Sequence, residues 1–521
     1  YASQEQTTVE GQFNTSVGSF SLRQNTIAEK NIAIGGLALN KSKASSNNTA
    51  VGFAAGANYN DSTTASIGAN IFIGFAAGEG STTPSSNTGA LNTVVGAYSL
   101  QDMTSGERNT TLGYVAGMDL TTGSYNTFLG AYTAADQIVT GSRNTLVGYL
   151  SGYKLKTGGY NVFVGQESGY ENDDGQANTG LGFGALYWNR GKQGATAVGY
   201  RSQFFVDSTD SEVWNYNTSL GAYALEGSNS AGSNTGEYNT AVGSYTMRSF
   251  TSGNRNTAIG SFAMNQTVTG EQNTANGVNA LYNNTGGSYN TAIGYVALET
   301  NTTGQQNVAV GAYALQNANA DGDYNTAVGY LCLRSANVAG NAYMTGLGYN
   351  AGNGAGNFAQ QSTYIGAWSG QNSNHSNVTC LGYNSWSTQN NQVNLGNGSI
   401  TSLRCNQTSI SSLSDARDKK DVVDLPIGLQ FINSLRPVKF VWDRRDGTMA
   451  GGIQEAGFIA QELDTAQSDA SAEEYMKLVS KDDPDRLEAA PGKLLPVLVK
   501  AIQELSAENA ALKARLDAAG L

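Results

Sequence analysis

The 521-residue chain is poor in the residues on which most metal sites and catalytic triads depend. It has three cysteines, Cys332, Cys380 and Cys405, and one histidine, His375. The cysteines are far apart and odd in number, which fits neither a disulfide framework nor a zinc site. We expect them to be small buried apolar residues. A single histidine argues against a Ser-His-Asp triad and a histidine-bound zinc, so we expect no metal and no cofactor.

Proline, charge and long apolar runs are also scarce. Six prolines beside 65 glycines exclude a collagen-like chain. Charged residues make up 13% of the chain and the net charge is −12, so no basic stripe is available for nucleic acid. No apolar run has the length of a membrane-spanning helix, and we expect no membrane insertion. The chain begins at Tyr1 rather than Met, and we expect a segment upstream of it to provide attachment.

What the sequence has in abundance is a repeat. Its motif is Asn-Thr-x-apolar-Gly, followed by aromatic or small residues and then Ala-Leu or Ala-Gly, as in NTTLGYVAG from Asn109. The motif glycine returns mostly every 17 residues, as from Gly96 to Gly113, with two longer intervals of 22 after Gly52 and two after Gly199. A fixed short period indicates stacked units that cover one another's apolar faces.

We expect each unit to be one turn of a β-solenoid. Thr-Ala-Val or Thr-Ala-Ile is typical of a short strand, Gly of a tight bend, Tyr-x-Ala-Leu of a second short strand and Thr-Gly-x-Tyr-Asn of a turn. Recurring Asn and Thr side chains are expected to form hydrogen-bond ladders, with Val, Ile, Leu and Ala pointing inward. One slender rod would leave apolar faces and strand edges exposed, which favours a homotrimer. The sequence leaves open whether each chain coils on itself or three chains interlace.

The repeat resembles the head repeats of trimeric autotransporter adhesins and the shafts of phage tail fibres. The resemblance covers roughly residues 10–400 and implies a shape rather than a function. The unit of 17 residues is longer than is usual in the adhesin heads.

From Ser414 the composition changes, and four blocks follow in order. They are Ser414-Asp415-Ala416-Arg417-Asp418-Lys419, Leu435-Arg436-Pro437-Val438-Lys439-Phe440-Val441-Trp442, Gly457-Phe458-Ile459-Ala460-Gln461-Glu462-Leu463 and a final apolar segment from Leu494 to Leu505. Together they resemble the C-terminal intramolecular chaperone of phage tail spikes, tail fibres and neck appendages, a self-cleaving serine peptidase family of endosialidase type. This chain has Val422 where the family often has Ile.

The resemblance implies roles for the first block. It makes Ser414 the nucleophile and Lys419 the base, with Asp415 and Arg417 as supporting residues and the cut between Leu413 and Ser414. Five residues apart, two side chains face away from each other on a regular strand and lie poorly on a regular helix. Either the backbone is irregular here or the dyad is completed across a trimer. The alternative interpretation is that Ser414 and Asp415 cap a helix.

The last 25 or so residues have a helical apolar pattern. Apolar residues recur at intervals of three and four, which is the seam of a coiled coil, and we expect a trimeric coiled coil over about residues 494–518. Its seam residues include Leu498, Ile502, Leu505, Asn509 and Leu512. The alternative is an amphipathic helix packed on its own domain.

Receptor contact is expected where the repeat is interrupted. Trp214 and Tyr216 lie in one of the 22-residue units, and Trp368, His375, Tyr383 and Trp386 lie where the strict period is lost before the chaperone. Aromatic rings beside Asn and Asp suit sugar recognition. The alternative for these residues is packing that closes the shaft.

The sequence therefore predicts a mainly β protein in three parts: a repetitive β shaft over 1–345, a distal tip region over 346–413 and an α+β chaperone over 414–521. We expect a trimeric phage tail fibre that binds a host glycan or protein receptor, joins the virion tail or baseplate through its upstream segment and cleaves itself once. The alternatives are a bacterial trimeric surface adhesin and a tail-spike glycan depolymerase.

Overall fold

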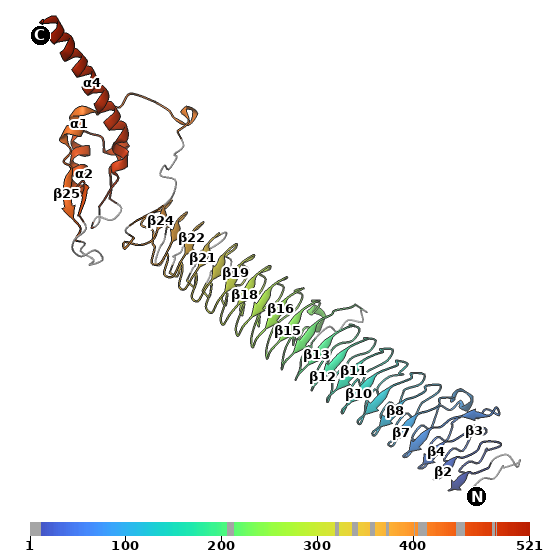
Figure 1. Cartoon of the computed structure of the whole chain (residues 1–521). Coiled ribbons are helices and arrows are strands. Elements are labelled where there is room, and N and C mark those ends of the chain that lie inside the picture. Colours follow the sequence, from blue (N-terminus) through green and yellow to red (C-terminus); the bar gives the residue numbers. More distant parts are fainter. Residues whose placement is uncertain are drawn as a thin grey trace. The chain divides into compact units, whose positions relative to one another are not determined.

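The computed structural model describes residues 12–205, 213–317, 322–335, 342–354, 360–370, 375–400, 402–404, 414–443, 454–481, 485 and 487–520. It divides into two compact units, Tyr1–Ser376 and Asn377–Leu521. The first unit is a β-solenoid whose turns stack along one axis, and the second contains a small α+β region that ends in a long helix (Figure 1). The predicted fold class, including the 17-residue period, is confirmed.

Each turn of the solenoid contributes one three-residue strand to a parallel ladder. The strands are β1 (Thr15–Val17), β2 (Ile32–Ile34), β4 (Thr49–Val51), β6 (Ile71–Ile73), β7 (Thr93–Val95), β8 (Thr110–Leu112), β9 (Thr127–Leu129), β10 (Thr145–Val147), β11 (Val162–Val164), β12 (Thr179–Leu181) and β13 (Thr196–Val198). They continue with β14 (Thr218–Leu220), β15 (Thr240–Val242), β16 (Thr257–Ile259), β17 (Thr274–Asn276), β18 (Thr291–Ile293), β19 (Val308–Val310), β20 (Thr326–Val328), β21 (Thr345–Leu347) and β22 (Thr363–Ile365).

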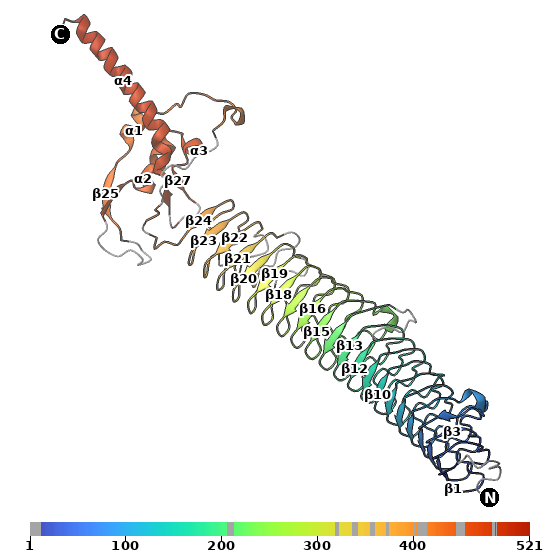
Figure 2. The same ribbon diagram turned by 45° about the vertical axis from the view of Figure 1, so that its right-hand side comes forward.

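The ladder shows that each chain coils on itself. Consecutive strands of the same chain pair in parallel and in a constant register, for example Thr110↔Thr127 and Leu112↔Leu129. Figure 2 shows the strands following one another along one side of the solenoid. The question that the repeat left open between a self-coiled and an interlaced shaft is therefore answered for the described turns.

The second strand expected in each repeat does not form. In the described repeats the Tyr-x-Ala-Leu segment is a turn, in which every second residue has a left-handed backbone, as at Val296 (φ 59°) and Leu298 (φ 54°). A β-strand needs negative φ throughout, so these residues cannot extend. The turn still bonds to its neighbour, because Leu100 N donates to the Ala116 carbonyl at 2.9 Å.

Buried side chains at several positions of the repeat fill the interior of the solenoid. The middle residue of each strand is buried or nearly so, most often Ala, as at Ala258 and Ala292, with larger rings at Phe72 and Phe128. The leucine of the turn, as at Leu298, is also buried. The expectation that the strand's Val, Ile or Leu points inward is wrong. That side chain is the third of the strand and, because side chains alternate along a strand, it points outward.

The predicted asparagine ladder is present. Asn273 is buried and its side-chain Oδ1 accepts from Asn290 N at 2.9 Å, while its Nδ2 donates to the Gly287 carbonyl at 2.9 Å. Asn256 and Asn290 repeat both bonds one turn away in either direction. The asparagine thus satisfies backbone groups at the bend before each strand, where no strand partner is available.

The 22-residue units keep the ladder and place their additional residues outside it. One contains β5 (Ser66–Ile67), which pairs in parallel with β3 (Ser45–Ser46) of the preceding turn, and the 3-10 helices η1 (Pro84–Ser86) and η2 (Ala231–Ser233) lie in two others. The ladder register continues across them, as in Thr49↔Ile71. The additional residues therefore leave the stacking unchanged.

The second unit begins with β23 (Thr379–Leu381) and β24 (Val393–Leu395), which pair in parallel. Then follow η3 (Ala416–Asp418), α1 (Leu429–Ser434), β25 (Val438–Val441), β26 (Gln454–Gly457), α2 (Ala460–Asp469), α3 (Glu473–Met476), β27 (Val479–Ser480), β28 (Glu488–Ala489), η4 (Pro491–Leu494) and α4 (Leu495–Ala518). β25 pairs antiparallel with β26, as β27 does with β28. A small apolar core includes Phe431, Leu463, Met476, Leu478 and Val497.

Cys332 and Cys380 are buried free thiols, as expected, and burial raises the pKa of Cys332 to about 12. Cys405 lies outside the described residues. In the part of the chain that the structure describes, no group of three or more His, Cys, Asp or Glu side chains is placed to hold a metal ion. No described helix is long and apolar enough to cross a membrane.

Candidate functional site

Ser414 and Lys419 are brought together by a short irregular turn. Asp415 is extended (φ −65°, ψ 135°), residues 416–418 form the 3-10 helix η3, and Lys419 is extended again (φ −119°, ψ 139°). The turn reverses the direction in which the two flanking side chains point. Lys419 Nζ donates to Ser414 Oγ at 2.7 Å. Of the two arrangements that the spacing left open, the single chain adopts the irregular backbone.

Asp415 and Arg417 hold this turn in shape. The Asp415 carboxylate caps η3, since its Oδ1 accepts from Arg417 N at 2.9 Å, and the same oxygen accepts from Arg417 Nε at 3.0 Å. The Arg417 guanidinium beside it lowers the pKa of the Asp415 carboxyl below its usual value. The capping role that we weighed as an alternative therefore belongs to Asp415, while Ser414 bonds to Lys419.

Both members of the pair are exposed in the single chain, and so is the segment that follows. Val422 and Val423 are 77% and 84% exposed, although both are apolar. A lysine accepts a proton only in its neutral form, which burial favours. The pair therefore has the contact that proton transfer needs but lies in water, beside an apolar stretch that is uncovered. Leu413, on the other side of the expected cut, lies outside the described residues.

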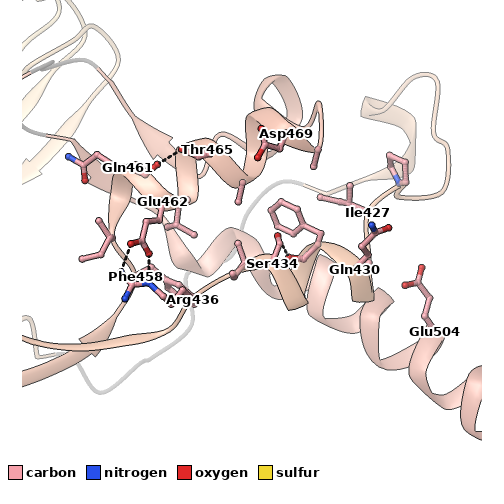
Figure 3. A pocket seen from close by; sticks show the side chains of 18 residues that line it. Ile427, Gln430, Ser434, Arg436, Phe458, Gln461, Glu462, Thr465, Asp469 and Glu504 are labelled. Carbon is pink, nitrogen blue, oxygen red and sulfur yellow. Dashed lines mark hydrogen bonds and ion pairs between the residues drawn. The ribbon is translucent and has the colours of Figure 1, made fainter.

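A groove of about 860 Å³ lies among the helices of the second unit (Figure 3). Its walls are α1, α2 and the segment before α1, with Phe431, Leu435 and Phe458 among its apolar lining and the ion pair between Arg436 and Glu462 at one side. The residues that line it are drawn from 426–470 and Glu504. The groove is therefore separate from the Ser414–Lys419 turn.

The structure adds two residues that we did not predict, Gly428 and Glu504. The α4 residue Glu504 caps α1 from 75 residues away, because its Oε2 accepts from Leu429 N at 2.7 Å. A Cβ at Gly428 would lie 2.2 Å from that oxygen. The sequence signal was weak but present, since α1 has Gly at its N-cap, where Ser, Thr, Asp or Asn would cap the helix from its own chain.

The expected coiled-coil seam is exposed. α4 packs on its own domain through Val497 and Ala501, both buried, and contacts α1. On another face, Leu498, Ile502, Leu505 and Leu512 are 40–66% exposed. Packing on the domain therefore uses a different face from the predicted seam, which is left without a partner in the single chain.

The expected receptor residues differ in how far they reach solvent. Tyr383 and Trp386 are 65% and 50% exposed, whereas Trp368 is half-buried and its ring contacts that of Tyr349 at a tilted angle, with the two centroids 5.3 Å apart. His375 is half-buried. Tyr364, which lies in the same stretch of sequence, is the middle residue of β22 and fully buried, so it fills the solenoid interior.

Trp214 and Tyr216 belong to a second stack of rings. The ring centroid of Trp214 lies 5.3 Å from that of Tyr216, and the centroid of Tyr216 lies 5.3 Å from that of Tyr238. A Cβ at Gly194 would meet the Trp214 ring at 2.8 Å, so the indole covers a position at which the turn has no side chain. All three residues are 44–50% exposed.

Residues 414–471 match the model of a family described as chaperone of endosialidase. The match begins at Ser414 and extends through η3, α1, β25, β26 and α2, while the repeat lies outside it. No curated protein matches the chain significantly. A β-solenoid shaft followed by a segment of this chaperone family fits a phage tail fibre or tail spike with a C-terminal chaperone.

Proposed function

We propose that this chain forms the shaft of a homotrimeric phage tail fibre and carries its own assembly chaperone, which it then releases. The observation on which this rests is the match of residues 414–471 to the endosialidase chaperone, directly after a solenoid of near-identical turns. A slip of one repeat between neighbouring chains costs such a shaft little. A shaft with many non-local contacts also folds slowly. A C-terminal domain that associates first would align the chains.

Release proceeds through Ser414. Its Oγ attacks the carbonyl carbon of Leu413 while Lys419 Nζ accepts the hydroxyl proton. The C–N bond then breaks, the proton passes to the departing amine of Ser414, and the Leu413 acyl group is held as an ester on Oγ. Water hydrolyses the ester, giving a new carboxyl end at Leu413 and a new amino end at Ser414. The contact of 2.7 Å between Nζ and Oγ supports this assignment.

Assembly is the step that makes Lys419 an effective base. In the single chain the dyad already has its contact but is exposed, and Val422 and Val423 beside it are uncovered. Packing of partner subunits around this segment would remove water from Nζ and favour the neutral amine. Cleavage would then follow correct assembly, and loss of the chaperone would make unfolding of the shaft difficult to reverse.

The test is the denatured intact mass of freshly expressed protein. The parent is expected as two pieces of about 43 and about 11 kDa, in proportion to the 413 and 108 residues on each side of the cut in a chain of 54.4 kDa. Ser414→Ala and Lys419→Met are expected as one whole chain. Lys420→Met, which removes the neighbouring lysine, is the matched control and is expected to be cleaved like the parent.

One further variant separates a base from a structural hydrogen bond. Lys419→Arg keeps a positive donor near Ser414 Oγ but does not accept a proton at neutral pH, so it is expected to remain whole. A single whole chain from the parent would show that the chaperone is retained, and Ser414 would then have a structural role only.

We propose that receptor contact lies in the region before the chaperone, where Tyr383 and Trp386 are the most exposed of the described rings. A Tyr383→Ala/Trp386→Ala variant should lose binding on an array of bacterial surface polysaccharides, while Trp214→Ala, in the shaft stack, should keep it. In this proposal the fibre is joined to the virion tail or baseplate. Equal binding by the double variant and the parent would remove these two residues from the receptor site.

A further inference from the structure

The third residue of each described ladder strand points outward, and these residues, apolar at every strand but one, form a line that we name the outer row. It consists of the third residue of β1, β2, β4 and β6 to β22. In order these are Val17, Ile34, Val51, Ile73, Val95, Leu112, Leu129, Val147, Val164, Leu181, Val198, Leu220, Val242, Ile259, Asn276, Ile293, Val310, Val328, Leu347 and Ile365. Because the strands pair in register, each of these side chains lies next to its counterpart on the neighbouring turn.

The outer row is too long and too apolar to face water. Ile73, Leu112, Leu220 and Ile293 are 39–50% exposed. At about 4.8 Å a turn the row runs for roughly 90 Å. Exposed rings, such as those of Tyr114 and Tyr295, lie two residues further along the chain and widen the strip. Monomeric proteins rarely expose contiguous apolar surface on this scale.

The occupant that fits the row is another copy of the same chain. A partner must offer one apolar side chain per turn, at the same rise, over the whole length of the ladder. A parallel copy of this solenoid has this spacing by construction, whereas the side chains of an unrelated surface would no longer match the rise per turn after a few turns. α4 supports the same conclusion independently, because its exposed seam of Leu498, Ile502 and Leu505 fits a parallel copy of itself.

One residue breaks the pattern. Among the described strands of the ladder, Asn276 in β17 is the one non-aliphatic member of the outer row, between Ile259 and Ile293. It is exposed, and within the described part of the chain its side-chain amide has no hydrogen-bond partner. A buried amide without a partner is costly, and a single Asn in an apolar seam between helices sets their register in this way.

We propose that the outer row is the surface along which copies of this chain pack, and that Asn276 sets their register. In register, Asn276 meets Asn276 of the partner subunit and the amides bond to one another. A slip of one turn places each amide against Ile259 or Ile293 of the partner subunit and leaves it buried without a partner. This inference rests on the proposed homotrimer and adds the interface and the residue that aligns it.

The test uses disulfide trapping in full-length chains. Cys332, Cys380 and Cys405 are replaced by Ala, and two differently tagged chains carrying Leu112→Cys or Leu129→Cys are co-expressed. In register, oxidation is expected to join 112 to 112 and 129 to 129, since a disulfide needs the two Cα atoms within about 7 Å. Asn276→Ile in both chains is expected to add mixed 112–129 species and to raise the melting temperature, because an apolar side chain replaces a buried amide.

Thr274→Ile is the matched control. It replaces a polar residue by Ile on the same strand, at the position that Ile32 and Ile71 occupy in β2 and β6, and it is expected to leave the trapping pattern unchanged. Asn276→Val, which matches Val242, repeats the test with a smaller side chain.

Each failure has a distinct meaning. A parent that sediments as a monomer overturns the proposed homotrimer together with this inference. A parent trimer that gives no 112–112 disulfide shows that the outer row faces elsewhere. A trimer with the expected disulfides and no mixed species in either Asn276 variant shows that the chaperone alone sets the register.

Discussion

At the scale of single residues, the shaft depends on glycines whose position no other residue can take. The motif glycine of each turn has positive φ and lies against the backbone of the next turn. Gly294 has φ +138°, and a Cβ there would lie 2.5 Å from the Gly311 carbonyl oxygen. Gly286, earlier in the same turn, has no such restriction, and its nearest neighbour would be Thr269 Oγ1 at 3.5 Å.

Gly294→Ala is therefore expected to destabilise the shaft, by about 1–3 kcal/mol from backbone strain and by more from the contact with Gly311. Gly286→Ala should change stability by less than about 1 kcal/mol. The thermal midpoints of both variants and the parent are measured from the β-sheet signal in circular dichroism. Equal losses in the two variants would contradict the steric argument.

At the scale of elements, the repeat also places side chains of the same charge next to one another in successive turns. Asp102, Asp119 and Asp136 occupy the same place in three consecutive turns. Partial burial, followed by the charges of Asp102 and Asp136, raises the pKa of Asp119 to about 6 from its ordinary value of 3.8. The folded chain therefore binds this proton more tightly than the unfolded chain does, so its stabilising effect is complete below about pH 4 and is lost as the pH rises through 6.

Asp119→Asn should remove this dependence. At pH about 7.5 the variant is expected to melt at a higher temperature than the parent, and at pH about 4 the two should agree closely. Asp61→Asn is the control, because Asp61 lies outside the aspartate column formed by Asp102, Asp119 and Asp136. Its melting temperature should match that of the parent at both pH values. If the melting temperature of the parent does not fall relative to that of Asp119→Asn between these two pH values, the repulsion within the aspartate column is offset in another way.

The α1–α4 contact is the second feature at this scale. Glu504→Ala removes the carboxylate that accepts from Leu429 N, and we expect the helical unit to lose about 1–2 kcal/mol, as for other N-caps. Glu508→Ala, one turn further along α4 and exposed, should have little effect. Ellipticity at the helix minimum reports this unit, because the described shaft consists of strands and turns with two short 3-10 helices.

At the scale of the whole molecule, assembly and cleavage are expected to be coupled. Ile502 is 66% exposed on the α4 seam, and Ile502→Asp should keep the chain monomeric by placing a charge in the seam. If assembly is what buries the dyad, the variant should also remain whole in denatured mass spectrometry. Ala510→Asp, exposed but outside the seam, is the control for both readouts. A monomeric Ile502→Asp chain that is cleaved would show that the dyad acts without partners.

The repeating features of this protein follow from its sequence. Asn-Thr-x-apolar-Gly at a period of 17 predicts a stacked β-solenoid with an asparagine ladder, because identical turns can satisfy their backbone groups only by pairing with one another. It also placed Ser414 and Lys419 in one motif through the family resemblance. These conclusions needed only local chemistry, spacing and a shared pattern.

The direction in which the strand side chains point became clear from the three-dimensional fold. Thr-Ala-Val could place either Ala or Val inside, since a shift of one residue reverses both faces of a strand. The buried Ala258 and exposed Ile259 settle the choice, and with it the outer row and the distinct position of Asn276. Likewise, the contact between Ser414 and Lys419 depends on the η3 turn, and the Glu504 cap joins residues 75 positions apart. Spacing along the chain does not encode such contacts, because they form only when separate elements pack.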